Sequence, residues 1–339
     1  MQDPTSAELV RSDDVHSDSS VTVTRATLRN LQELDIVLPL NRFVCITGYS
    51  LTGMHSLIYD ILYGNLRRLV GRQKRRKIPL HGCRRIEGYE SIERVIDIDQ
   101  APLRSTNRSC LATHIGISHA VRRLFSGTAA AQQRGLCARH FSLMVNCHPA
   151  APQVLYNGKS IQNVLRMTVD QAVGFFHGHR RICEALGCLQ ETGLGQLRLG
   201  KPASEISGGE AQRIKLAREL LDSRAASGRR TLYILEHPTA GLRRFDKFTA
   251  PPEWRFMTPD AVDKLTQSLR RLVAAGHSVV VTEKNLRVAR AADWVIDTGL
   301  NGKDSGVKVR TVYAGPFEKV VTEEGSEIGA YFGYVAPQA

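Results

Sequence analysis

The sequence predicts an α/β fold in which buried strands alternate with amphipathic helices. Three apolar runs, 43–47, 232–235 and 278–282, have the length and composition of buried strands. The segment that starts at Ser207 has the start signal and the apolar spacing of a helix. With 339 residues, 42% of them hydrophobic, the chain is long enough for two domains or one elaborated domain.

The helix that begins at Ser207 is the most distinctive stretch of the chain. Ser207 and Glu210 have the spacing of a capping box. Between them, Gly208 and Gly209 leave backbone N–H groups open at the positive end of the helix dipole, where a phosphate can bind. Because capping boxes are common, an ordinary amphipathic helix explains the same residues.

The string Ser-Gly-Gly-Glu-Ala-Gln-Arg at 207–213 resembles the signature motif of ABC-type ATPases, and its last four residues resemble the UvrA family of excinuclease ABC proteins. The resemblance extends over about residues 21–332 and matches only the C-terminal of that family's two nucleotide-binding halves. It implies an ABC-type ATPase core of P-loop NTPase fold with an inserted signature subdomain. The implied parts are a disordered tail (1–20), the first part of the core (21–66), the inserted signature and DNA-contact subdomain (67–200), the second part of the core (201–333) and a tail (334–339).

The loop 48–56 follows predicted strands at 21–24, 34–38 and 43–47 and resembles a P-loop. The nucleotide-binding positions that match the family are Gly48, Ser50, Gly53 and Ser56. Met54 stands where a lysine would reach the phosphates, and His55 stands where a hydroxyl would hold Mg²⁺. We therefore expect a loop that keeps the P-loop shape and has lost catalytic nucleotide binding.

A dense basic cluster follows the helix predicted over 57–69. Its members are Arg67, Arg68, Arg72, Lys74, Arg75, Arg76 and Lys77. The net charge of +13 favours a polyanionic partner, so we interpret the cluster as a clamp on the phosphate backbone of DNA. A solvated flexible loop is the alternative interpretation.

Gln100 ends a predicted strand at 92–99 and resembles the Q-loop residue of the family. A helix is expected over 113–125, and residues 139–142 are expected to lead into a strand. A zinc module built on two Cys-x-x-Cys pairs follows in the family, but only Cys147 and His148 remain nearby here. Because a structural site of that kind needs four thiolates, no zinc is expected.

The strand at 232–235 resembles a Walker B strand. Glu236 follows it at the Mg²⁺ position with a side chain one methylene longer than the family's aspartate. His237 replaces the glutamate that polarises water, although a histidine can also act as a base. Lys284 replaces the histidine that contacts the γ-phosphate. A helix over 260–274, a strand at 278–283 and an edge strand at 312–316 complete the core.

The signature motif is intact while the catalytic positions of the chain's own ATP site are substituted. We therefore expect the chain to lend its signature to an ATP site shared with a partner, with ATP and Mg²⁺ as cofactors there. Hydrolysis by this chain alone is not expected. The alternative is that the signature helix persists because it packs the core of a decayed remnant.

The resemblance implies a UvrA-like DNA-binding subunit of nucleotide excision repair. Double-stranded DNA, a second copy of the chain or a complete UvrA-like ATPase half are the expected partners. Two alternatives stay open: a regulatory protein that docks on such an ATPase without touching DNA, and a residual ATPase in which Lys284 or another cation replaces the lost lysine. Seven scattered cysteines, no signal-like N-terminus and no long apolar run predict a cytoplasmic protein without a membrane partner.

Overall fold

A computed structural model describes residues 19–330 of the protein with several short gaps. The gaps are residues 49–50, 71–77, 105, 107–108, 144–146, 226–228, 243–258, 302–307, 324 and 327. The chain forms two compact units. Unit 1 comprises the described residues of Met1–Asp99, Ala226–Thr239 and Leu269–Ala339, and unit 2 those of Gln100–Ala225 and Ala240–Ser268.

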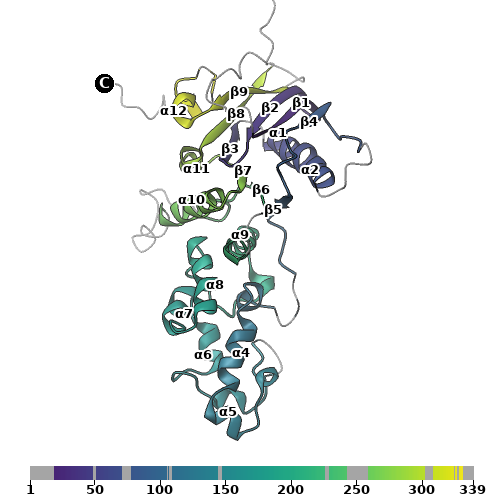
Figure 1. Ribbon diagram of the computed structural model, residues 1–339. Coiled ribbons are helices and arrows are strands. Elements are labelled where there is room, and N and C mark those ends of the chain that lie inside the picture. Colours follow the sequence, from purple (N-terminus) through teal and green to yellow (C-terminus); the bar gives the residue numbers. More distant parts are fainter. Residues whose placement is uncertain are drawn as a thin grey trace, which may run out of the picture. The chain divides into compact units, whose positions relative to one another are not determined.

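Unit 1 is built on a nine-stranded sheet with the strand order β4-β1-β2-β9-β8-β3-β7-β6-β5 (Figure 1). The strands are β1 (Ser20–Leu28), β2 (Leu31–Pro39), β3 (Phe43–Gly48), β4 (Arg85–Glu87), β5 (Arg94–Asp97), β6 (Thr231–Glu236), β7 (Ser278–Thr282), β8 (Trp294–Asn301) and β9 (Lys308–Gly315). The five strands from β8 to β5 pair in parallel. The predicted buried strands are confirmed as β3, β6 and β7, at the centre of this parallel part.

Helices cover both faces of the sheet, which explains why its central strands are apolar on both sides. The helices are α1 (Leu51–His55), the π-helix η1 (Ser56–Tyr63), α2 (Gly64–Leu69), α11 (Leu286–Ala291) and α12 (Phe317–Val320). In Figure 1, α1 and α2 lie on the opposite side of the sheet from α11 and α12. Val44 and Ile46 of β3 share a core with Met54 and Ile58 of the helix that follows.

Unit 2 is helical. Its elements are α3 (Leu111–His114), α4 (Ser118–Ser126), α5 (Ala129–Gln133), η2 (Ala138–His140), η3 (Ala151–Gln153), α6 (Ile161–Arg166), α7 (Val169–Phe175), α8 (Arg180–Glu191), η4 (Ala203–Glu205) and the signature helix α9 (Gly208–Ala225). A last helix, α10 (Pro259–Ala274), has residues in both units. Neighbouring aromatic rings of Phe125, Phe141 and Tyr156 form part of the core.

Three predicted elements are wrong in detail. The helix expected over 113–125 is broken, because Gly116 has a φ of 85° between α3 and α4. Residues 139–142 contain the end of a 3₁₀ turn in place of an approach to a strand. The strand expected at the edge, β9, lies inside the sheet between β2 and β8.

The two compact units also divide the chain at other positions than the expected boundaries. Residues 78–99 belong to unit 1, because β4 pairs with β1 and β5 pairs with β6. The signature helix was expected in the core but belongs to unit 2, where α9 packs against α8.

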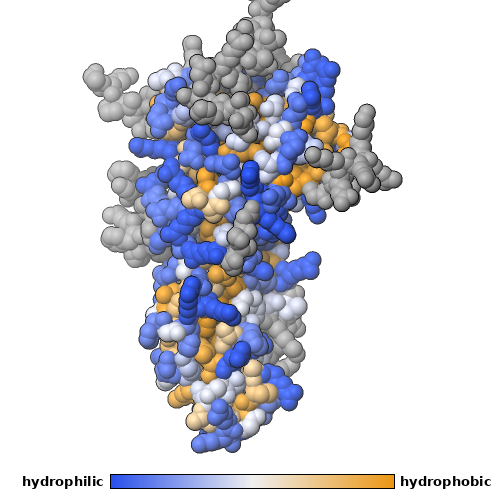
Figure 2. All heavy atoms as spheres, viewed as in Figure 1, coloured by the Kyte–Doolittle hydropathy of each residue, from blue (hydrophilic) through white to orange (hydrophobic). Residues whose placement is uncertain are grey.

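The visible face of the molecule carries hydrophilic residues interspersed with smaller apolar groups (Figure 2). Leu155, 53% exposed, is a large apolar side chain on the surface of unit 2. Among the described helices, none has the length and apolar character that a membrane span requires.

Candidate functional site

The centre of the candidate site in unit 1 is a direct contact between His55 and Glu236. His55 ends α1 and Glu236 ends β6, and Nδ1 of the imidazole lies 3.0 Å and 3.2 Å from the two carboxylate oxygens. Since a carboxylate only accepts, the imidazole donates this hydrogen bond. The ring of His55 also stacks on Tyr59, with centroids 4.9 Å apart. Burial, together with the charges of Asp97 and Glu236, raises the pKa of Tyr59 far above its ordinary value.

The P-loop-like segment uses its other described positions for packing. Met54 is 1% exposed and belongs to the core of unit 1. Ser56 is buried, and its hydroxyl is 3.3 Å from Nη1 of Arg29, which donates to it. Gly48 has a φ of 139°, and a Cβ there would lie 2.0 Å from the carbonyl oxygen of Thr298, so only glycine fits. Gly53 is buried, whereas Ser50 lies outside the described residues.

This arrangement does not fit an ATP-bound Mg²⁺ in the manner of the family. The resemblance assigns Mg²⁺ to a hydroxyl at position 55 and a carboxylate at position 236. Here the imidazole of His55 donates to that carboxylate, and Mg²⁺ prefers oxygen ligands and water. Met54 offers no charge for a phosphate and is buried in the core.

A buried carboxylate that the sequence analysis missed holds the loops at the ends of β6 and β7. Glu283 is 4% exposed and accepts four hydrogen bonds. The backbone N–H groups of Lys284 and Asn285 donate to one oxygen at 2.9 Å and 3.1 Å. The backbone N–H and hydroxyl of Thr239 donate to the other at 3.0 Å and 2.6 Å. Glu283 directly follows the buried parallel strand β7, and this position in the sequence could have indicated its role.

The two other substituted positions lie near this carboxylate: Lys284 follows it in the chain, and His237 bonds to the residue before it. His237 has a φ of 44°, a left-handed backbone conformation, and its N–H donates to the carbonyl oxygen of Thr282 at 2.8 Å. The side chain of Lys284 is exposed. Glu283 therefore fixes the backbone beside Lys284 without burying its ammonium group.

In unit 2 the predicted capping box is confirmed at the start of α9. The backbone N–H of Ser207 donates to the carboxylate of Glu210 at 2.9 Å, and the N–H of Glu210 lies 3.4 Å from the Ser207 hydroxyl. Lys201, which the sequence analysis missed, donates to both oxygens of Glu210 at 3.0 Å and 2.8 Å. Burial alone would raise the pKa of Glu210, but the hydrogen bonds from Lys201 and Ser207 outweigh it and lower that pKa.

The signature glycines have a packing role. A Cβ on Gly209 would lie 2.1 Å from the carbonyl oxygen of Ala240, and one on Gly208 would lie 3.1 Å from that of Gln100. Thus the backbone of Gln100 and the loop after Thr239 both approach the first turn of α9. The intact glycines are consistent with the alternative in which the signature helix persists for packing.

Arg213 of α9 is a buried cation. Its side chain is 4% exposed, and Nη1 donates to the carbonyl oxygen of Ala240 at 3.0 Å. Burial lowers its pKa to about 10. Gln212 beside it is 1% exposed, so α9 is buried around much of its circumference.

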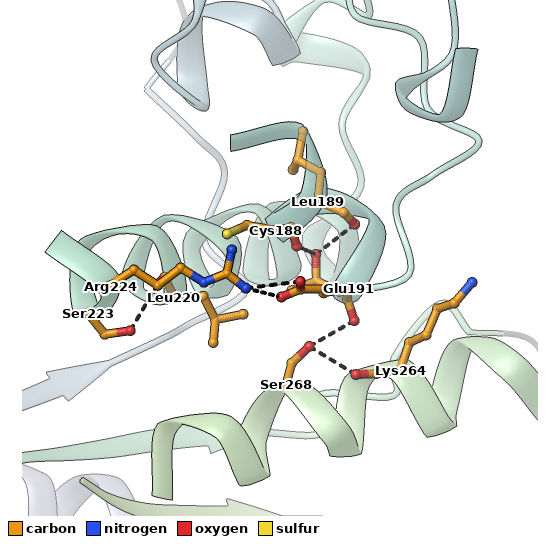
Figure 3. A network of polar contacts seen from close by, with 9 residues as sticks. Cys188, Leu189, Glu191, Leu220, Ser223, Arg224, Lys264 and Ser268 are labelled. Carbon is orange, nitrogen blue, oxygen red and sulfur yellow. Dashed lines mark hydrogen bonds and ion pairs between the residues drawn. The ribbon is translucent and has the colours of Figure 1, made fainter. Parts of the chain in front are cut away.

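A polar network fixes the other end of the signature helix (Figure 3). Arg224 of α9 donates through Nη2 to both carboxylate oxygens of Glu191 in α8, each at 2.9 Å. The hydroxyl of Ser268 in α10 donates to the backbone carbonyl oxygen of Glu191 at 2.8 Å or to that of Lys264 at 2.9 Å. The end of α8 is therefore joined to both α9 and α10.

Two members of the candidate DNA-binding cluster, Arg67 and Arg68, lie in the part of the chain that the structure describes. Arg67 is exposed, with its guanidinium 5.9 Å from the ring centroid of Tyr63. Arg68 instead donates to the carbonyl oxygen of Gly64 at 3.0 Å and to Oδ1 of Asn65 at 2.6 Å. The remaining members, Arg72, Lys74, Arg75, Arg76 and Lys77, lie outside the described residues.

Cysteine and histidine side chains gather where the family has its zinc module. Sγ of Cys137 lies 3.6 Å from Nδ1 of His140, and the rings of His140 and His148 have centroids 5.2 Å apart. The thiol of Cys147 donates to the backbone carbonyl of His140 at 3.6 Å. In the described part of the chain, no three or more His, Cys, Asp or Glu side chains are arranged to hold a metal ion.

The parallel sheet and the loops at the carboxyl ends of β3, β6 and β7 define an ABC-type nucleotide-binding half of P-loop NTPase fold. No family model matches the chain. It is 38% identical to the UvrABC system protein A of Aquifex aeolicus over 92% of its own length and 35% of the relative's. It is also 38% identical to that of Thermus thermophilus, over 91% of its length and 34% of the relative's.

Solved structures agree with these relatives. The crystal structure of UvrA2 from Deinococcus radiodurans is 33% identical with a TM-score of 0.75, over 93% of this chain and 39% of that one. These matches identify the chain as a UvrA-family relative that corresponds to the C-terminal ABC-type half. The chain spans about a third of the length of the curated relatives it matches.

Proposed function

We propose that the chain is a UvrA-like DNA-binding subunit of nucleotide excision repair, with impaired ATP hydrolysis at its own site. It lends its signature motif to an ATP site shared with a second copy or with a complete UvrA-like ATPase half. The relatives, each named UvrABC system protein A, support the repair assignment. A cytoplasmic location belongs to the same proposal.

The contact between His55 and Glu236 is the observation that carries the impaired ATP site. It joins the two side chains that the family would direct at Mg²⁺ and leaves no hydroxyl at position 55. Met54 adds to the impairment because its side chain packs in the core. ATP and Mg²⁺ would therefore be held mainly by the partner's P-loop.

The state of the signature motif supports the second part of the proposal. Ser207 is exposed at the start of α9, and the capping box around it is complete. A helix start with free backbone N–H groups favours a phosphate of a nucleotide bound elsewhere. An exposed helix start of this kind supports the proposal that the motif acts on another chain's nucleotide.

The experiment adds the chain to a complete UvrA-like ATPase half and measures Mg²⁺-dependent phosphate release. We expect the wild type to stimulate release and Ser207→Arg to abolish the stimulation, because the long cation occupies the phosphate position. Ser204→Arg, at another exposed serine just before the motif, is the matched control and should stimulate like the wild type. Equal stimulation by Ser207→Arg and the wild type would contradict signature sharing.

DNA binding rests on charge. The chain carries a net charge of +13, and Arg67 is exposed at the end of α2. Binding through such cations follows the phosphate backbone and weakens steeply with salt. Duplex affinity that does not change with salt would argue for a regulatory partner that does not touch DNA.

We also propose that the chain holds no structural zinc. The cluster of Cys137, His140, Cys147 and His148 lacks the two Cys-x-x-Cys pairs of the family's module. Elemental analysis of the purified chain tests this point. Stoichiometric zinc that is lost in Cys147→Ser would overturn it.

A further inference from the structure

A cavity of about 630 Å³ lies within unit 2, close in sequence to the signature helix. Its walls are α6, the turn formed by residues 196–202 and the end of η4. This volume falls within the usual range of sites for small molecules and cofactors. None of the site residues discussed above, except Lys201, lines it.

Backbone hydrogen bonds hold the two main walls together. The N–H of Gly200 donates to the carbonyl oxygen of Leu165 at 2.8 Å, and the N–H of Leu199 donates to that of Met167 at 3.0 Å. A Cβ on Gly200 would lie 2.9 Å from the Leu165 oxygen, so the close approach requires glycine. The cavity is therefore formed before any ligand arrives.

Positive charge dominates the lining. The lining contains three cations, those of Arg166, Arg198 and Lys201, and a single carboxylate, that of the exposed Glu205. Within the described residues, neither Arg166 nor Arg198 forms an ion pair, and both are exposed. Two free guanidinium groups at one cavity are suited to bind a phosphate through paired hydrogen bonds.

The rest of the lining is suited to the remainder of a nucleotide. Leu165, Leu197 and Pro202 supply apolar surface, and Gln162 supplies an amide. A base can pack on apolar side chains while an amide bonds to its polar edge. An inorganic phosphate alone would leave this apolar surface and much of the volume unused.

We propose that this cavity binds a nucleotide, with its phosphate held by Arg166 and Arg198, and that Lys201 couples the bound phosphate to the signature helix. Lys201 lines the cavity and also donates to both carboxylate oxygens of Glu210. Glu210 in turn accepts from the backbone N–H of Ser207. A phosphate that attracts Lys201 therefore weakens its bonds to Glu210 and loosens the cap around Ser207.

The test is calorimetry on the full chain with two probes, AMP and a short single strand of oligothymidylate. We expect Arg166→Ala/Arg198→Ala to weaken binding about tenfold or more, because two charge-assisted contacts are lost. Arg181→Ala removes another exposed arginine of unit 2 outside the cavity and is the matched control. Binding of Mg²⁺-ATP by unit 1 is measured in a separate titration. The result for the cavity can therefore be interpreted even if the proposal about the ATP site fails.

The two probes distinguish the source of the phosphate. AMP binding that is lost in the double variant indicates a free nucleotide. Loss of oligothymidylate binding alone indicates a nucleotide within a nucleic-acid strand. Absence of binding by the wild type for both probes, or equal binding by the double variant and the wild type, overturns the site.

Hydrogen exchange at the Ser207 amide tests the coupling. We expect the bound probe to speed exchange at this amide in the wild type and to leave it unchanged in Lys201→Met. Unchanged exchange in the wild type at saturating probe would overturn the coupled site as proposed.

Discussion

Nδ1 of His55 lies 3.0 Å from the carboxylate of Glu236, at two positions where the UvrA-family resemblance expects ligands of Mg²⁺. The two residues are far apart in the sequence and meet because β3 and β6 both pair with β7 in a parallel sheet. Two substitutions that the sequence shows separately thus form a single interaction. This interaction is the structural basis on which we propose that the ATP site is impaired.

Replacing His55 by serine should restore part of the Mg²⁺ site. The change frees the Glu236 carboxylate and supplies the hydroxyl that Mg²⁺ prefers. We expect Mg²⁺-dependent ATP binding by calorimetry to become roughly tenfold tighter than in the wild type. His55→Ser/Glu236→Ala is the control and should lose the gain. An affinity of His55→Ser equal to that of the wild type would show that the pair is not what blocks the site.

Replacing Glu283 by alanine should strongly destabilise unit 1. The change leaves the backbone N–H groups of Thr239, Lys284 and Asn285 without their acceptor. We expect a loss of about 2–4 kcal/mol in the free energy of unfolding, measured with denaturant. Glu93→Ala, at an exposed position of the same unit, should stay within about 0.5 kcal/mol. Similar losses in both variants would contradict the buried clamp.

Gly209 and Gly187 form a matched pair for the packing role of the signature. A Cβ at Gly209 would lie 2.1 Å from the Ala240 oxygen, whereas one at Gly187 in α8 meets no atom within 4 Å. We expect Gly209→Ala to cost about 1–3 kcal/mol in the free energy of unfolding. Gly187→Ala should stabilise the chain by about 0.5–1 kcal/mol because alanine favours a helix. Equal effects would refute the close approach at Gly209.

The capping box should lose strength in acid. Hydrogen bonds from Lys201 and Ser207 outweigh burial and lower the pKa of Glu210, so the folded chain binds this proton less readily than the unfolded chain. The stabilisation is therefore present above the ordinary glutamate pKa of about 4.3 and is lost as the pH falls through the lowered value. Unfolding measured against pH should show a smaller acid loss in Lys201→Met. An identical pH profile would contradict the assigned role of Lys201.

Replacement of Arg67 should affect DNA binding, whereas replacement of Arg68 should affect the stability of the fold. Arg67→Ala should weaken duplex binding for every sequence tested and lower the salt dependence by about one phosphate contact. Arg68→Ala should instead cost about 1 kcal/mol of stability, since its guanidinium binds Gly64 and Asn65. Anisotropy titrations over a range of salt concentrations and thermal unfolding measure the two effects. An unchanged duplex affinity in Arg67→Ala would remove this residue from the DNA surface.

Much of the fold follows from local patterns. The apolar runs of β3, β6 and β7 and the capping box at Ser207 were visible because each depends on a few neighbouring residues. The interior position of β9 was not, because it depends on pairing with β2, which is far away in the chain.

The site was predicted as separate positions, and its contacts were missed. Lys201 and Glu210 are nine residues apart and meet only because a turn precedes α9. Arg213 gave no signal of burial, since charged residues on a helix usually face water. The carbonyl oxygen of Ala240 that accepts from it belongs to a loop whose path the sequence does not indicate.

Calorimetric titration of the wild-type chain with ATP and Mg²⁺ tests the central claim most directly. The pair of His55 and Glu236 and the buried Met54 predict no binding tighter than about 1 mM by the chain alone. Micromolar binding that requires Mg²⁺ would contradict the impaired site and make hydrolysis by this chain the next reaction to measure.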